Sequence, residues 1–203
     1  MIDISATQLQ ADLETHHIEG IARMDATGTK WKIPLIGPVT DSLWQGGCLN
    51  GVNLKGYFQH IVSLYPWERY NPGCQLQSFV EVTLYDSADM PGTEQLYLLA
   101  RWINLRRAEG RVLVHCQAGL NRSGLVAGLA LILEGIEPDV AIRMLRSARC
   151  EQVLCNHMFE SWLRKQVPGA SSSPSRSTTA ALTPSVPAAK VGNTRTPRKA
   201  VSA

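Results

Sequence analysis

The chain has 203 residues, of which 44% are hydrophobic and 18% are charged, with a net charge of +3. This composition suits one soluble globular domain plus appendages. The longest apolar run, near Leu125 to Leu133, contains glycine and is too short to span a bilayer. Because no basic patch with an apolar stretch follows Met1, we expect no secretion signal and no membrane partner.

The positive charge is concentrated at the C-terminal end. Residues 168–203 hold five basic residues and no acid, so the remaining 15 basic residues face 17 acidic ones. This segment is rich in Ser, Thr, Pro and Ala and lacks aromatics, which predicts a disordered basic tail. We expect its charges to be solvated, and nucleic acid could be bound only through this tail.

The five cysteines show no disulfide framework. There is no Cys-x-x-Cys and no Cys/His set with the spacing of zinc ligands. We therefore expect free thiols in a reducing compartment, a cytoplasmic location, no metal and no cofactor.

The first half of the chain predicts mainly strands. Residues 1–40 are interpreted as an extension that packs on the following domain or leads into it, with a helix over 7–19 and a loop with short strands over 24–39. Three core strands are predicted next, at 42–47, 59–65 and 78–85. In the last of these, Val80, Val82 and Leu84 share one face.

The second half alternates further strands with helices. Residues 93–107 predict an amphipathic helix, ended near Gly110, with apolar residues at i, i+3, i+4 and i+7. A strand at 111–115 follows, and then helices at 121–133, from Pro138 onwards and at 155–165. The alternation predicts an α/β fold with a single mostly parallel sheet flanked by helices on both faces.

One stretch, His115-Cys116-Gln117-Ala118-Gly119-Leu120-Asn121-Arg122-Ser123, joins a predicted strand to a predicted helix. The backbone N–H groups of such a loop and the start of the helix can surround one tetrahedral anion. These donors and Arg122 favour the thiolate form of Cys116. Gly119 has no Cβ and allows close backbone approach or unusual dihedral angles. Together these groups indicate nucleophilic attack on phosphorus.

With its pattern of His-Cys, five residues, Arg and Ser, this stretch resembles the signature of the cysteine-dependent protein tyrosine phosphatases, most closely the small dual-specificity branch. The resemblance runs from about Ser42 to Leu163 and implies a protein-tyrosine-phosphatase-like catalytic domain over 41–167. It implies that Cys116 attacks phosphorus, that Arg122 grips two phosphoryl oxygens and that Ser123 helps the thiolate to leave. The implied phosphate-binding residues are Gln117, Ala118, Gly119, Leu120, Asn121 and Arg122, with His115 orienting the loop.

The leaving oxygen needs a proton. In relatives, an aspartate lies some thirty positions before the cysteine, on the loop after the preceding strand. Asp86, which is 30 residues before Cys116, is the first choice, and Asp89 is the second. The alternative is that both are turn residues or caps of the following helix.

Two further features of relatives have plain alternatives here. Cys48 or Cys74 would be the partner of Cys116 in a protective disulfide of the kind some relatives form, but each also suits a buried core thiol. Asn156 and His157 match a weak family tendency before the last helix, for which helix capping is a sufficient explanation.

The resemblance implies hydrolysis of phosphotyrosine in proteins through a phosphocysteine intermediate, with phosphoserine and phosphothreonine as further substrates. We expect a phosphorylated protein as the partner and a monomeric enzyme. The uncharged loop side chains argue against inositol phosphates. RNA 5′-triphosphatase activity is the main alternative, because residues 119–124 resemble the loop of that branch, although Asp86 argues against it. An inactive phospho-binding module is the alternative of another class.

Overall fold

The structure, a computed structural model, describes residues 16–21, 28 and 30–170. Residues 7–15 of the helix predicted over 7–19 lie outside this part of the chain, as does the expected tail from residue 171 onwards. The rest of the predicted helix lies in the described chain, and there the prediction is wrong, because β1 (His17–Ile21) is an extended strand. It pairs antiparallel with β2 (Lys30–Pro34), and this pairing, rather than local helix propensity, decides its backbone.

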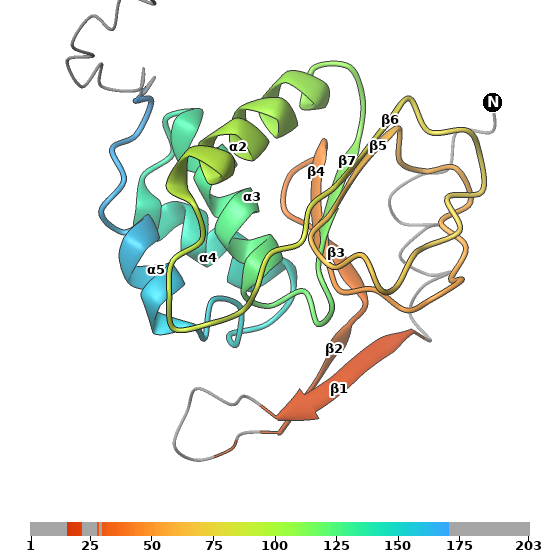
Figure 1. The fold of residues 1–203 in the computed structure, drawn as a ribbon, viewed down its shortest axis with the longest axis horizontal. Coiled ribbons are helices and arrows are strands. Elements are labelled where there is room, and N and C mark those ends of the chain that lie inside the picture. Colours follow the sequence, from red (N-terminus) through yellow and green to blue (C-terminus); the bar gives the residue numbers. More distant parts are fainter. Residues whose placement is uncertain (1–15, 22–27, 29, 171–203) are drawn as a thin grey trace, which may run out of the picture. The chain divides into compact units, whose positions relative to one another are not determined.

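Five strands form the central sheet in the order β3-β4-β7-β5-β6 (Figure 1). β3 runs antiparallel to β4, and the other neighbours are parallel. The mostly parallel α/β sheet predicted from the sequence is therefore confirmed. The five strands are β3 (Ile36–Pro38), β4 (Leu43–Gly46), β5 (His60–Ser63), β6 (Ser78–Glu81) and β7 (Val112–His115).

The predicted strand over 78–85 ends four residues early, because β6 lies at the edge of the sheet and its ladder with β5 stops at Glu81. Its predicted alternation nevertheless continues beyond the ladder. Val80 and Val82 are half-buried and Leu84 is fully buried, whereas the residues between them are exposed. The segment from 82 to 86 therefore carries the chain along the sheet edge towards the carboxyl ends of the strands.

The helices of the described chain pack on one face of the sheet, as Figure 1 shows. α3 lies at the centre, since every residue of it from Arg122 to Ile132 is buried. Within α3, Gly128 lets the helix approach Leu145 and Leu163 closely. The helices predicted from residue 93 onwards are confirmed, and the one over 93–107 has identical bounds. They are α2 (Thr93–Arg107), α3 (Arg122–Leu133), α4 (Pro138–Ala148) and α5 (His157–Leu163).

The opposite face of the sheet is covered differently. Trp44, Ile61 and Leu113 alternate with the helix-facing residues of their strands and pack in a second cluster with Tyr57 and Phe58. The segments after β4 and β5 cover this face without a helix (Figure 1). We expected helices on both faces of the sheet, but in the described part of the chain they cover one face only. Glycines with positive φ interrupt these segments, at positions 51, 56 and 73.

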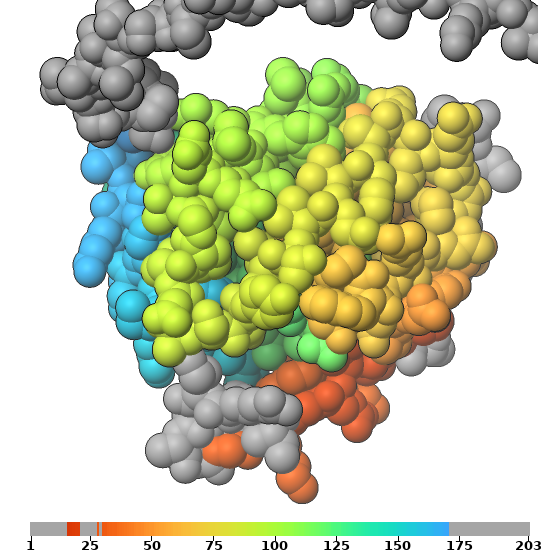
Figure 2. Space-filling view, in the orientation of Figure 1, coloured from red at the N-terminus to blue at the C-terminus, as the bar shows by residue number. Residues whose placement is uncertain are grey.

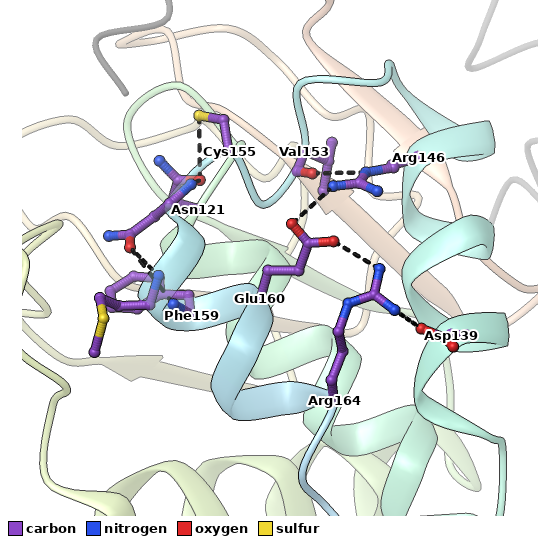
Figure 3. Close-up of polar contacts among 10 residues, drawn as sticks. Asn121, Asp139, Arg146, Val153, Cys155, Phe159, Glu160 and Arg164 are labelled. Atoms are coloured by element: carbon purple, nitrogen blue, oxygen red, sulfur yellow. Dashed lines mark hydrogen bonds and ion pairs between the residues drawn. The ribbon is translucent and has the colours of Figure 1, made fainter. Parts of the chain in front are cut away.

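Ion pairs attach α5 to α4, as Figure 3 shows. The Glu160 carboxylate accepts from Arg146 (3.2 Å) and Arg164 (2.8 Å), and Arg164 also contacts Asp139. Arg146 Nε donates to the carbonyl of Val153 (3.1 Å). These contacts fix the turn that leads into α5. Within the described ranges, no helix has the length and apolar character needed to cross a membrane.

The two-sided packing of β7 predicts a strong effect of Leu113→Ala. Leu113 is fully buried in the central strand, so this variant should lose about 3 kcal/mol of unfolding free energy. Leu98→Ala, at a position on α2 that is 59% exposed, should change it by less than about 0.5 kcal/mol. Denaturant titration of both variants measures the difference. Equal and small losses would contradict the assignment of Leu113 to the core.

Candidate active site

The loop between β7 and α3 lies at the carboxyl ends of the parallel strands, where α/β sheets bind ligands. The main-chain carbonyls of its residues 117–120 all accept hydrogen bonds from surrounding groups, and so point away from Cys116. Gln117 accepts from the Cys48 N–H (2.9 Å), and Leu120 accepts from the Leu154 N–H (3.2 Å). The Gly119 N–H instead points to Cys116 Sγ (3.2 Å).

Arg149, just after α4, holds the middle of the loop. Its buried guanidinium donates to the carbonyls of Gly119 (2.6 Å), Ala118 (3.4 Å) and Pro34 (2.6 and 3.0 Å). Burial lowers the pKa of Arg149, but a guanidinium remains charged in proteins. The positive charge of Arg149 therefore lies behind the loop, and the carbonyl oxygens that accept its hydrogen bonds stabilise it there.

Gly119 cannot carry a side chain in this arrangement. Its φ is +70°, a conformation that costs other residues energy. A Cβ would lie 2.0 Å from Arg149 Nη1 and 2.2 Å from backbone atoms of Gly46 and Gly47. Both reasons for expecting glycine here, an unusual dihedral angle and close backbone approach, thus apply.

The Cys116 side chain is buried at the floor of the loop. Its Sγ lies 3.6 Å from the Oγ of Ser123, in the first turn of α3. Gln45 on β4 donates through Nε2 to Ser123 Oγ (3.3 Å) and to the Gly119 carbonyl (3.0 Å). In the thiol form, Cys116 Sγ donates to this oxygen, which also accepts from Gln45, and the Ser123 hydroxyl can donate to the sulfur once the sulfur is a thiolate.

Arg122 begins α3 and is 8% exposed. One of its terminal nitrogens donates to the carbonyl of Leu84 (3.3 Å), and the guanidinium carbon lies 5.3 Å from the centre of the Tyr65 ring. Its buried Nε has no hydrogen-bond partner among the described residues. A buried N–H of a charged group is costly without an acceptor, so this atom indicates a site for an anionic oxygen.

Asp86 lies beside the loop between β7 and α3, although it belongs to the segment that follows β6. Its two carboxylate oxygens accept from Asn121 Nδ2 and Asn156 Nδ2, both at 2.9 Å. Asn156 also caps α5 by accepting from the backbone N–H groups of the next turn. Within the described residues, the exposed Asp89 carboxylate makes no hydrogen bond, and its carbonyl accepts from Ser87 Oγ. Of the two candidate acids, Asp86 is the one that the structure ties to the loop.

His115, the last residue of β7, is buried behind the loop. Its ring packs edge-on against Tyr70 (5.2 Å between centres), and its carbonyl accepts from the Leu64 N–H. Burial lowers the pKa of His115 to about 4, so the ring is neutral at neutral pH. Tyr70 donates to the carbonyl of Gly47 (2.6 Å), next to the same loop.

All five cysteines are free in the structure. Cys48 contacts the loop through its backbone, whereas Cys74 lies exposed, near Gly56. Burial, followed by the nearby Glu68 and Cys116, raises the pKa of the Cys48 thiol to about 12. The Cys155 thiol donates to Asn121 Oδ1 (3.4 Å), as Figure 3 shows. Of the two cysteines considered as partners of Cys116, Cys48 is therefore the one beside the loop.

Three residues that shape the site were not predicted from the sequence: Gln45, Arg149 and Tyr65. Gln45 is polar within an otherwise apolar strand that is fully buried, and this pattern is a usable signal. Arg149 and Tyr65 carry no local signal, because their partners are distant in the sequence. Capping explains Asn156 only in part, since the same side chain also holds Asp86.

Residues 58–167, more than half of the chain, match the family described as the catalytic domain of dual specificity phosphatases. The chain belongs to this family. It is a phosphatase of the dual-specificity type, and the matched residues include the His115–Ser123 stretch from which this family was expected. Among curated proteins, no sequence matches significantly.

Solved structures share the fold. A mouse putative dual specificity phosphatase complexed with zinc tungstate is 21% identical, with a TM-score of 0.54, and the match covers 64% of this chain and 87% of the other. Human DUSP28 is 19% identical, with a TM-score of 0.51 and coverage of 64% and 93%. Tk-PTP in the active form is 22% identical, with a TM-score of 0.50 and coverage of 66% and 99%. The protein-tyrosine-phosphatase-like fold is thereby confirmed.

The environment of Gly119 predicts that Gly119→Ala lowers the unfolding free energy by more than about 2 kcal/mol, the upper end of the cost of positive φ alone. It should also weaken binding of tungstate more than about 10-fold. Gly51→Ala is the matched control, since its φ is +78° and nothing lies near its Cβ position. This control should keep its tungstate affinity in calorimetric titrations. Equal affinity in both variants would show that the close approach at Gly119 does not shape the loop.

Proposed function

We propose that the protein hydrolyses phosphotyrosine in proteins through a phosphocysteine intermediate, with phosphoserine and phosphothreonine as further substrates. The observation that carries this proposal is the buried, unpaired Nε of Arg122 in the same loop as Cys116. A phosphoryl oxygen supplies the acceptor that this atom lacks, and a guanidinium can bind two such oxygens side by side. The first turn of α3, whose N-cap Asn121 makes no side-chain capping bond, adds its dipole.

In the first step, the Cys116 thiolate attacks phosphorus. An S–P bond forms and the bond from phosphorus to the ester oxygen breaks. Protonated Asp86 gives its proton to the departing oxygen. Asn121 and Asn156 aim this carboxyl group towards the loop, and Arg122 stabilises the charge on the equatorial oxygens.

In the second step, water attacks phosphorus and the S–P bond breaks. The Asp86 carboxylate accepts the proton of the water, which restores the acid. The Ser123 hydroxyl, fixed by Gln45, donates a hydrogen bond to the sulfur as it regains negative charge. His115 acts as a neutral packing residue that orients the loop, since its pKa lies near 4.

We propose residues 41–167 as the catalytic domain, with β3 of the preceding extension completing the sheet and the segment from 168 as a basic tail. We further propose a monomeric protein in the cytoplasm, where free thiols persist. Binding of nucleic acid would involve the tail alone.

The substrate class is tested by a parallel assay on phosphotyrosine peptide, phosphoserine peptide, phosphoinositide and 5′-triphosphate RNA. We expect the phosphotyrosine peptide to be turned over fastest. RNA triphosphatase activity remains the alternative, because residues 119–124 resemble that branch, and the engagement of Asp86 beside the loop is the observation against it. Fastest turnover of the RNA would overturn the proposal.

The nucleophile assignment predicts that Cys116→Ser lowers kcat for aryl phosphates at least about 1000-fold, because a hydroxyl replaces the thiolate. Binding of a phosphotyrosine peptide should persist, since the loop and Arg122 are retained. Cys74→Ser, at an exposed cysteine, is the matched control and should retain full activity. Activity that survives in Cys116→Ser and requires a divalent ion would contradict the proposal. Binding without any wild-type turnover would favour a phospho-binding module.

The general-acid assignment predicts that Asp86→Asn lowers kcat for phosphotyrosine about 100-fold or more. The loss should be smaller for an activated aryl phosphate, whose leaving group departs without much protonation. Asp89→Asn is the matched control, because that carboxylate is not bonded to the loop in the described chain. If Asp89→Asn alone shows this dependence on the leaving group, the acid is Asp89. If neither variant does, the chemistry is closer to that of the RNA triphosphatase branch.

A further inference from the structure

An aromatic pair leads from the loop between β7 and α3 to the surface. Tyr65 and Trp67 follow the carboxyl end of β5, and their ring centres lie 4.9 Å apart with a tilt of 55°. The Tyr65 ring lies 5.3 Å from the guanidinium carbon of Arg122. Trp67 is 60% exposed. The pair thus begins at the cation that grips phosphate and ends in a large apolar ring open to solvent.

The segment that carries the pair is held in place from both sides. Arg69 donates to both carboxylate oxygens of Glu81 on β6, at 2.8 and 3.2 Å. Tyr70 is buried and donates to the Gly47 carbonyl (2.6 Å), and Ser63 Oγ donates to the carbonyl of Tyr65 (3.2 Å). An aromatic ring on such a fixed segment loses little conformational freedom when a ligand stacks on it.

Reach and charge favour an aromatic occupant. The two spacings keep the Trp67 ring centre within about 10 Å of the Arg122 guanidinium carbon, close enough for a ring attached to a bound phosphate to stack at about 4.5–7 Å. The side chains of 117, 118 and 120 in the loop are uncharged. Glu68, between Trp67 and Arg69, and Asp86 are acidic, so a polyanionic group would be repelled here.

We propose that Tyr65 and Trp67 form a subsite for the phenyl ring of phosphotyrosine, in which Trp67 determines the preference for aryl over alkyl phosphates. This inference rests on the proposed function, because it requires that the loop between β7 and α3 binds the phosphoryl group. Tyr65 supports the Arg122 guanidinium through its ring face, and Trp67 stacks on the substrate ring.

Steady-state kinetics on two peptides of one sequence, phosphorylated on tyrosine or on threonine, provide the first test. In Trp67→Ala, the ratio of kcat/KM for phosphotyrosine to that for phosphothreonine should fall about 10-fold, the scale of one aromatic contact. Trp67→Phe should retain most of the ratio. Phe79→Ala is the matched control, since Phe79 is an aromatic residue of β6 that is 44% exposed. An unchanged ratio in Trp67→Ala, or an equal fall in Phe79→Ala, would overturn the proposal.

A binding measurement separates this subsite from the proposed reaction. In the Cys116→Ser background, calorimetry compares phenyl phosphate with methyl phosphate, and neither measurement requires turnover. A preference for phenyl phosphate that Trp67→Ala removes supports the subsite, even if the wild-type protein fails to hydrolyse phosphotyrosine and the proposed function is thereby rejected. The converse result is that the wild-type protein hydrolyses phosphotyrosine, while Cys116→Ser shows the same preference for phenyl phosphate with and without Trp67→Ala. This result rejects the subsite and leaves the proposed function standing.

Discussion

The site depends on the outward orientation of four consecutive carbonyls, those of residues 117–120. Each accepts from a group outside the loop, and Arg149 supplies the strongest donors because it is charged and buried. With these oxygens turned away, none of these four carbonyl dipoles opposes a thiolate or a phosphoryl group at Cys116. Buried carbonyls need partners wherever they point, so the guanidinium of Arg149 both satisfies them and adds positive charge behind the loop.

The parallel sheet gathers the remaining parts at one edge. Strand ends that are neighbours in space deliver Tyr65 from β5 and the Leu84–Asp86 segment from β6 to the loop that follows β7. Arg122 contacts both segments, through the Leu84 carbonyl and the Tyr65 ring. The side chains proposed to bind phosphate, to supply the proton and to hold the phenyl ring therefore lie on neighbouring segments at one edge of the sheet, and a shift of any of these strands would disturb all three.

The last helix helps to position Asp86, the proposed general acid. Asn156 is fully buried, caps α5 and donates to both Asp86 and the Ser87 carbonyl. The Glu160 ion pairs hold α5 against α4, so the orientation of Asp86 rests on helix packing some distance from the loop. Burial has a different effect on Cys48, which lies beside the same loop. It raises the pKa of this thiol to about 12, so the thiol keeps its proton at neutral pH.

Local signals in the sequence determined the order of strands and helices from residue 42 onwards, the bounds of α2, and the strand-loop-helix setting of Cys116, Gly119, Arg122 and Ser123. These features depend on residues that are close in the chain, through hydrophobic periodicity and short-range spacing. Only the tertiary structure decided that β1 pairs with β2, that non-helical segments cover one sheet face, and that Gln45 and Arg149 hold the Gly119 carbonyl across separations of 74 and 30 residues. It also decided that Asp86, rather than Asp89, meets Asn121 and Asn156. Such contacts arise from the packing of distant segments, which no local pattern records.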